Sequence, residues 1–155
     1  MKAVLPYVEG MLRPESDEFG LLIGAEPVEM TTDSSYFELM EALWAKGESF
    51  LVLEQDVLPA MKDYRRMLTC SQPYCIAPYS GPGKHMIDKG LGFTRFRDTC
   101  IQAHPNLFAQ IRGLADSEPF HPEDWRRLDV RMNFWLGKAH LHEPVAHLHN
   151  YSGDR

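Results

Sequence analysis

Phe-Leu-Val-Leu-Glu-Gln-Asp-Val-Leu-Pro, residues 50–59, is the stretch that decides the fold of this chain. Its first four residues are apolar, and the acidic tripeptide Glu54-Gln55-Asp56 follows them directly. An apolar run of this length before a polar break is typical of a strand that is covered on both faces, as in a parallel sheet. We therefore predict a central buried strand that ends in two carboxylates.

The two acids of this tripeptide, Glu54 and Asp56, stand where open α/β sheets usually bind ligands, at the carboxyl end of a strand. They are two residues apart, so in extended backbone their side chains would share one face and could hold a hard cation between them. Alternatively, the acids only mark the point at which the strand reaches water. The tripeptide alone leaves both interpretations open.

Strand and helix patterns alternate on either side of the central strand. Further strands are predicted at residues 2–5, 27–30 and 91–96, and helices at residues 13–24, 35–47, 60–68, 97–104 and from 122 onward. Ser35 and Glu38 have the spacing of a capping box, and Gly24 and Gly47 are suited to end the first two helices. Such alternation predicts a parallel sheet with right-handed crossovers.

Length, composition and charge limit the class of protein to which this chain can belong. The chain has 155 residues, of which 44% are hydrophobic and 25% charged, as in a globular domain. We expect one domain over residues 1–150 and a flexible tail at 151–155. A net charge of −6 argues against a nucleic-acid partner. No apolar run approaches the roughly 20 residues that span a bilayer, and no signal pattern is present, so we expect a cytoplasmic protein without a membrane span.

Residues at the end of the first predicted strand point to a ligand. The first strand stops at Pro6 and Tyr7, which leaves an aromatic ring at the sheet edge, where a planar base could stack. Otherwise Pro6 only ends the strand and Tyr7 packs at the rim of the core. Gly92, within the predicted strand at 91–96, indicates a close approach of the backbone or a bulge.

Asp129 is the acid that stands out in the predicted helix from Pro122. It falls within an apolar stripe formed by Trp125, Leu128, Met132 and Leu136. A carboxylate on a packed helix face is costly unless it has a partner or points into a cavity. Asp129 is therefore a candidate functional acid, and the alternative is a structural acid with a satisfied partner.

Cysteine and histidine residues give a weaker metal signal. Cys70 and Cys75 are too far apart for a common zinc knuckle, and three cysteines make a poor disulfide framework. The triplets at 140–142 and 147–149 both read His-Leu-His. In a strand both imidazoles of such a triplet share one face, which is a workable geometry for a metal. The same spacing allows a cluster of surface histidines.

A set of runs in this order resembles a known family over nearly the whole chain. The runs are 4–7, 36–44, 50–59, 90–92, 125–129 and 142–149. They are similar to small glycosyltransferase-like proteins from actinobacteria and their phages, which depend on nucleotide sugars. The resemblance implies an α/β fold with a three-layer, mostly parallel, Rossmann-like sheet flanked by helices, a minimal version of the A-type glycosyltransferase fold.

The resemblance also implies roles for individual residues. Glu54 and Asp56 would bind a divalent cation, Mn²⁺ or Mg²⁺, and the diphosphate, with His149 or else His147 as the third metal ligand. Asp129 would be the general base near the acceptor. The nucleotide sugar would be bound by Pro6, Tyr7, Asp33, Gln55 and Gly92. Glu54 replaces the first Asp of the commonest motif, and this puts metal dependence in question.

The function expected from this resemblance is that of a metal-dependent glycosyltransferase. It would move a sugar from a nucleoside-diphosphate-sugar donor to a hydroxyl acceptor, a protein or a glycan that the sequence does not identify. One alternative is a nucleotide-sugar-binding module without turnover. Another is an enzyme with a His-based transition-metal site. A small sheet with an exposed edge would also allow a homodimer.

Overall fold

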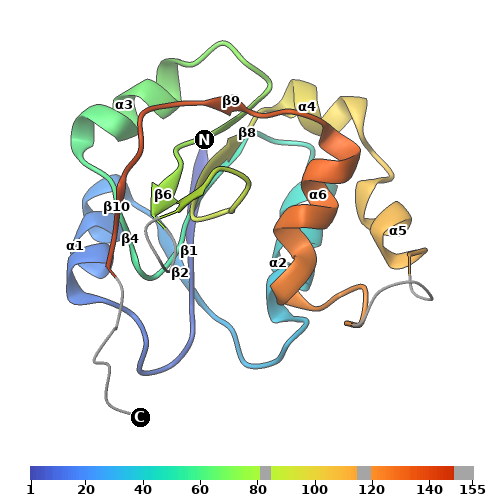
Figure 1. Cartoon of the computed structure of the whole chain (residues 1–155), viewed down its shortest axis with the longest axis horizontal. Coiled ribbons are helices and arrows are strands. Elements are labelled where there is room, and N and C mark those ends of the chain that lie inside the picture. Colours follow the sequence, from blue (N-terminus) through green and yellow to red (C-terminus); the bar gives the residue numbers. More distant parts are fainter. Residues whose placement is uncertain (81–84, 115–119, 149–155) are drawn as a thin grey trace.

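A six-stranded sheet forms the centre of the computed structural model, which describes residues 1–80, 85–114 and 120–148 (Figure 1). In their order across the sheet, the strands are β2 (Glu26–Glu29), β1 (Lys2–Tyr7), β3 (Phe50–Leu53), β8 (Phe93–Phe96), β5 (Tyr74–Ile76) and β9 (His140–Leu141). β8 runs antiparallel to both of its neighbours, and all other pairs are parallel. The sheet is therefore mixed but mostly parallel, with a single reversed strand.

Helices cover both faces of this sheet and complete three layers (Figure 1). One face carries α1 (Pro14–Ile23) and α3 (Met61–Thr69), and the other carries α2 (Ser35–Ala45), α4 (Asp98–Ala103), α5 (Leu107–Arg112) and α6 (Leu128–Leu136). Leu51 and Leu53 of β3 pack on the α1 side, and Phe50 and Val52 pack on the α2 side. All four are buried, as the continuous apolar run predicts.

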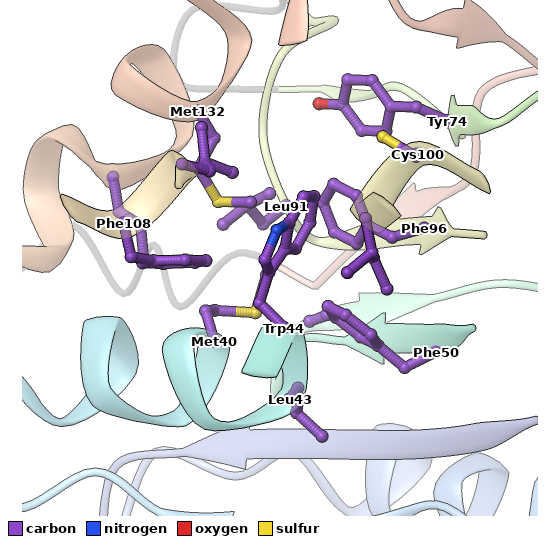
Figure 2. Close-up of a cluster of buried hydrophobic side chains, with 14 of the residues drawn as sticks. Met40, Leu43, Trp44, Phe50, Tyr74, Leu91, Phe96, Cys100, Phe108 and Met132 are labelled. Carbon is purple, nitrogen blue, oxygen red and sulfur yellow. The ribbon is translucent and has the colours of Figure 1, made fainter. Parts of the chain in front are cut away.

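Trp44 of α2 lies in the middle of the apolar cluster between the sheet and the helices that cover its α2 side (Figure 2). Its ring meets Phe50, Phe96 and Phe108 edge-on, with ring centroids 5.4 to 6.3 Å apart. Its indole N–H donates to the carbonyl of His104 over 2.9 Å, so the polar end of the buried ring is satisfied. This packing fixes α2 against the sheet, and the first turn of α2 reaches the candidate site.

The carboxyl ends of the first two helices follow the prediction. Gly24 and Gly47 both have a φ of 69°, in the left-handed region that favours glycine after a helix. Two later helices differ from the prediction. α6 begins at Leu128 rather than at Pro122, after a 3-10 turn, η2 (Trp125–Arg127), and α5 was not predicted.

The predicted capping box at the start of α2 is wrong. Ser35 Oγ accepts hydrogen bonds from the backbone N–H groups of Thr31 and Thr32, which precede the helix. Ser34 Oγ donates to Glu38 Oε1 over 3.0 Å. The Ser35 side chain therefore stabilises the loop between β2 and α2, whereas Ser34 bonds to a side chain of the first turn rather than to its free N–H groups.

β1 also continues past its predicted end and includes Pro6 and Tyr7. Beyond Val4, β1 pairs only with β2 and no longer with β3. A proline has no N–H to donate and is tolerated in a strand where one side needs no bond. The strand therefore runs through Pro6 and ends at Tyr7.

Short strand pairs join the loops at the carboxyl edge of the sheet. β4 (Val57–Leu58) pairs antiparallel with β10 (Ala146–His147), and β6 (Tyr79–Ser80) pairs antiparallel with β7 (Met86–Ile87). The predicted tail at 151–155 lies outside the described residues. The pairing of β4 with β10 brings the C-terminal segment to the acidic tripeptide.

The edges of the sheet are β2 and β9. β2 reads Glu-Pro-Val-Glu, and proline and charged residues hinder the pairing of an edge with another chain. A homodimer through an exposed edge stays a prediction. None of the helices within the described ranges has the length and apolar character needed to cross a membrane.

Candidate active site

A pocket of about 570 Å³ opens at the carboxyl edge of β1, β2 and β3. Its wall is formed by the residues that follow these strands, by the first turn of α2 and by the turn before α6. The structure brings six of the predicted site residues together here, and they are Pro6, Tyr7, Asp33, Glu54, Gln55 and Asp56. This is the edge at which open α/β sheets bind ligands.

Glu54 is the most deeply placed acid of the pocket. Its Oε1 accepts a hydrogen bond of 2.8 Å from the hydroxyl of Tyr36 on α2. The pKa of Glu54 is raised to about 7, chiefly by burial and also by the charges of Asp56 and Asp129, while the hydrogen bond from Tyr36 opposes the rise in part. Near neutral pH the carboxyl group therefore exchanges readily between its protonated and ionised forms.

The acidic tripeptide forms a tight turn and not the extended backbone that we predicted. The N–H of Val57 donates to the carbonyl of Glu54 over 3.2 Å, which closes the turn between β3 and β4. Gln55 Oε1 accepts a hydrogen bond of 2.6 Å from the N–H of Val8, so its side chain fixes the loop after β1. Glu54 and Asp56 still face one pocket, because the turn returns Asp56 to the pocket wall.

His147 on β10 faces Asp56 across the carboxyl edge. Its Nε2 lies 3.1 Å from Asp56 Oδ2, and its Nδ1 lies 2.8 Å from the carbonyl oxygen of Ser80. Burial lowers the pKa of His147, but the bonds to Asp56 and Ser80 outweigh it, so the pKa is raised overall. His147 is thus held beside the acidic turn as a partner of Asp56. His149 lies outside the described residues.

Asp129 lies in the first turn of α6 and is half-buried. Burial raises its pKa, and the N–H of Val130 donates to its Oδ1 over 2.7 Å, which counteracts the rise in part. Its charge in turn raises the pKa values of Glu54, Tyr36 and Tyr79, so these groups are electrostatic neighbours. Asp129 does not line the 570 Å³ pocket itself.

Tyr7 and Trp125 supply aromatic surface to the wall of the pocket. Trp125 is 52% exposed, and its backbone N–H donates to the carbonyl of Asp33 over 3.0 Å. The carboxylate of Asp33 is largely exposed and pairs with Arg126, with Oδ2 and Nη2 3.0 Å apart. The part of the pocket wall formed by Tyr7, Trp125 and Asp33 therefore combines aromatic faces with exposed hydrogen-bonding groups.

Gly92 lies outside the pocket wall. Its carbonyl accepts a hydrogen bond of 2.8 Å from the N–H of Glu54. A Cβ on Gly92 would stand 2.5 Å from Cε1 of Tyr79 and 2.8 Å from Cγ2 of Val57. The predicted close approach at this glycine is confirmed, and it is an approach of the Tyr79 ring. Its predicted contact with a nucleotide sugar stays a prediction.

The pocket residues that sequence reasoning missed include two aromatic ones, Tyr36 and Trp125. The sequence places Tyr36 only within the run 36–44 of the family resemblance, and Trp125 within the apolar stripe of the helix predicted from Pro122. The signal for Tyr36 was its position one residue after Ser35, at the start of a helix that begins at the ligand-binding edge. Trp125 gave no such signal, because it belongs to η2 and its exposure follows from the late start of α6.

The donor atoms of Glu54, Asp56 and His147 do not converge as a set of three. In the described part of the chain, the three-residue group whose potential ligand atoms all lie within 4.8 Å of one another is instead Cys70, His140 and His142. The acidic turn thus offers a pair of carboxylates, with His147 already hydrogen-bonded to one of them.

Comparison with known proteins gives distant likenesses only. No model of a protein family and no curated protein matches the chain. Among solved structures, A197 from STIV has 13% sequence identity and a TM-score of 0.47, over 66% of this chain and 68% of that one. A glycosyltransferase involved in the glycosylation of the major capsid of PBCV-1 has 11% identity and a TM-score of 0.49, over 93% of this chain and 83% of that one.

Proposed function

We propose that this chain is a metal-dependent glycosyltransferase that moves a sugar from a nucleoside-diphosphate-sugar donor to a hydroxyl acceptor. One observation carries the proposal. Two carboxylates from the turn after the central strand line a pocket whose wall also contains aromatic residues, and a third carboxylate on α6 is their electrostatic neighbour. A nucleoside-diphosphate sugar would fit this arrangement through a divalent cation, because the cation can bind the carboxylates and the negatively charged diphosphate together.

The nucleoside would lie against the wall formed by Tyr7, Trp125 and Asp33. Tyr7 and Trp125 offer ring faces for a base. Asp33 is exposed there, and a carboxylate is a good acceptor for ribose hydroxyls. Pro6 and Gln55 would shape the wall between base and diphosphate. Gly92 would act indirectly, because its carbonyl holds the backbone of Glu54.

A divalent cation, Mn²⁺ or Mg²⁺, would be held by Glu54 and Asp56. Carboxylate oxygens are the ligands that these cations prefer. The donor set fits a cation, because the charges of Asp56 and Asp129 raise the pKa of Glu54 and a cation would relieve this repulsion. His147 would either release Asp56 and become a ligand or stay as its partner, and His149 is the other candidate third ligand. When bound, the cation would neutralise the charge of the leaving diphosphate.

Asp129 would take the proton from the acceptor hydroxyl as the new glycosidic bond forms. A base of this kind works best when its affinity for a proton is raised, and burial raises the pKa of Asp129. Its position beside Glu54, but outside the wall of the donor pocket, suits a group that meets the acceptor rather than the nucleotide. Tyr36 would keep Glu54 oriented through the hydrogen bond to its Oε1.

The experiment that tests turnover is an assay of nucleoside diphosphate release. The protein is incubated with UDP-, GDP- and TDP-sugars and Mn²⁺, with water and simple glycans as acceptors. We expect release from at least one donor, and loss of that release in Asp56→Ala. Binding of a donor without any release would favour the binding module over the enzyme.

A further inference from the structure

The donor atoms of Cys70, His140 and His142 form a cluster that the proposed function does not use. One ring nitrogen of each histidine and the Sγ of Cys70 all lie within 4.8 Å of one another. Cys70 follows α3, whereas His140 lies in β9 and His142 just after it, so the cluster joins segments about 70 residues apart in the chain. Thiolate and imidazole are the ligands that zinc prefers.

The backbone directs these side chains to one face of the sheet. His140 pairs in register with Cys75 of β5, so both side chains point to the same side of the sheet. Cys75 belongs to the apolar cluster on the α1 and α3 side. His142 lies two residues after His140 and is held to β5 because its N–H donates to the carbonyl of Ile76 over 2.9 Å. Both imidazoles therefore face the end of α3.

Arg95 fixes the third member of the cluster. Its guanidinium is buried and donates to the carbonyls of Leu68, Cys70 and Gln72 over 2.6 to 3.2 Å. The loop that carries Cys70 is thus held in one conformation before any ligand binds. The positive charge of the neighbouring Arg66 is paired with Glu143, and this pairing weakens the repulsion between Arg66 and a cation bound at the cluster.

His142 also carries an unsatisfied polar atom. Its Nε2 is buried, and it has no hydrogen-bond partner within the described residues. Buried polar atoms without a partner are uncommon in folded proteins and call for an explanation. A metal ion bound to Nε2 of this half-buried ring would give the atom a partner. The other two members approach from α3 and β9, so the ion would lie between the two elements.

The distances suit a tetrahedral ion. Zn–N bonds of about 2.0 Å and Zn–S bonds of about 2.3 Å place neighbouring ligand atoms about 3.3 to 3.5 Å apart in a tetrahedral site. The present separations, up to 4.8 Å, would close by about 1 Å through small side-chain rotations. Cys70 is partly exposed and His140 is exposed, so an ion can reach the cluster from solvent.

We propose that Cys70, His140 and His142 bind a zinc ion that clips β9 to the end of α3, with water in the fourth position. The site is separate from the candidate active site. β9 is three strands away from β3, which is about 14 Å across the sheet. The segment after His142 leads to β10 and His147, so the clip would hold in place the chain that carries His147 to Asp56.

The test is titration of the reduced, metal-free protein with Co²⁺ and Zn²⁺. One Co²⁺ ion per chain should give the absorption that thiolate coordination produces, and Zn²⁺ should displace this ion. His140→Ala is the sharpest variant, because an exposed side chain can be removed without disturbing the fold. It should weaken Zn²⁺ binding at least tenfold, as should His142→Ala, and Cys70→Ala should abolish the thiolate absorption.

Three control variants separate this site from other metal-binding groups. His85→Ala removes an exposed histidine elsewhere, Cys100→Ala removes another thiol, and Asp56→Ala removes a proposed Mn²⁺ ligand. All three should keep the thiolate absorption of bound Co²⁺, and Zn²⁺ should raise the melting temperature of the wild type more than that of His140→Ala. The proposal is overturned by absence of Co²⁺ and Zn²⁺ binding, by binding without thiolate absorption, or by unchanged affinity in His140→Ala and His142→Ala.

Discussion

Glu54 combines a buried carboxyl group, a phenol that donates to it and two further acids nearby. Its pKa in the folded protein, about 7, is well above its ordinary value of 4.5. The folded state therefore holds the proton more tightly than the unfolded chain does. Stability from this group is fully present below pH 4.5 and is lost as the pH rises through 7.

Glu54→Gln should make stability less dependent on pH. In metal-free buffer the variant should gain about 2 kcal/mol in free energy of unfolding relative to the wild type between pH 5 and pH 8, because Gln cannot ionise. Urea unfolding at several pH values measures this difference. Glu48→Gln, which changes an exposed side chain, serves as the control. Its plot of unfolding free energy against pH should run parallel to that of the wild type. A Glu54→Gln curve that also runs parallel would contradict the raised pKa.

Asp129→Asn tests the proposed base without removing the shape of the side chain. Donor binding should stay within about threefold of the wild type, since Asp129 does not line the donor pocket. The rate of sugar transfer should fall by about 10²- to 10⁴-fold, the usual contribution of a general base. Calorimetry and a nucleotide-release assay provide the two readouts. A variant that transfers sugar at the wild-type rate would exclude Asp129 as the base.

The sequence predicted those site residues that follow strands. Pro6, Tyr7, Glu54 and Asp56 meet in one pocket because the ends of parallel strands meet at one edge. The partner of Asp56 could not be predicted, because β10 pairs with β4 across about 90 residues of chain and no local pattern encodes that pairing. Tyr36 was hidden for a similar reason, since its bond to Glu54 depends on how α2 packs.

At the scale of elements, Arg95 holds the loop between α3 and β5. It is 3% exposed and serves three backbone carbonyls. Arg95→Met should leave those carbonyls without their donor and cost about 2–4 kcal/mol in free energy of unfolding. Arg97→Met is the matched control, because Arg97 donates to one carbonyl, that of Ser71, near the surface, and it should cost less than about 1 kcal/mol. Equal losses in the two variants would contradict the account.

Gly92 is the second element-scale test, at the start of β8. Gly92→Ala would push a methyl group against Tyr79 and Val57, which are packed on the α1 side of the sheet. We expect a loss of about 1–3 kcal/mol, the usual range for overpacking. Gly113→Ala is the control, because the nearest atom to its Cβ would be 3.4 Å away. Thermal unfolding of both variants decides whether stability requires a glycine at position 92. Equal melting temperatures for the two variants would contradict this requirement.

The type and order of many elements followed from the sequence, because apolar runs and glycine positions are local signals. The direction of β8 did not follow. An apolar run such as Phe93–Phe96 packs equally well in either direction, and the direction depends on where the chain leaves β7 and enters α4. The capping box failed because Ser35 has two competing partners, Thr31 and Thr32, in the preceding loop.

At the scale of the whole molecule, the C-terminal segment connects the two proposed metal sites. It forms the outermost strand β9, passes the cluster of Cys70, His140 and His142, and reaches the acidic turn through β10 (Figure 1). The three layers leave the carboxyl edge of β1, β2 and β3 open, and the pocket lies there. The central claim is that this pocket binds a nucleoside-diphosphate sugar together with a divalent cation.

A thermal-shift screen of UDP-, GDP- and TDP-sugars, each with and without Mn²⁺, tests this claim most directly. With Mn²⁺ and a donor at about a hundred times its dissociation constant, the melting temperature should rise by about 5 °C or more. Asp56→Ala should lose the rise, and Asp88→Ala, which removes an exposed acid, should keep it. Absence of a shift with every donor, with and without Mn²⁺, would contradict the claim.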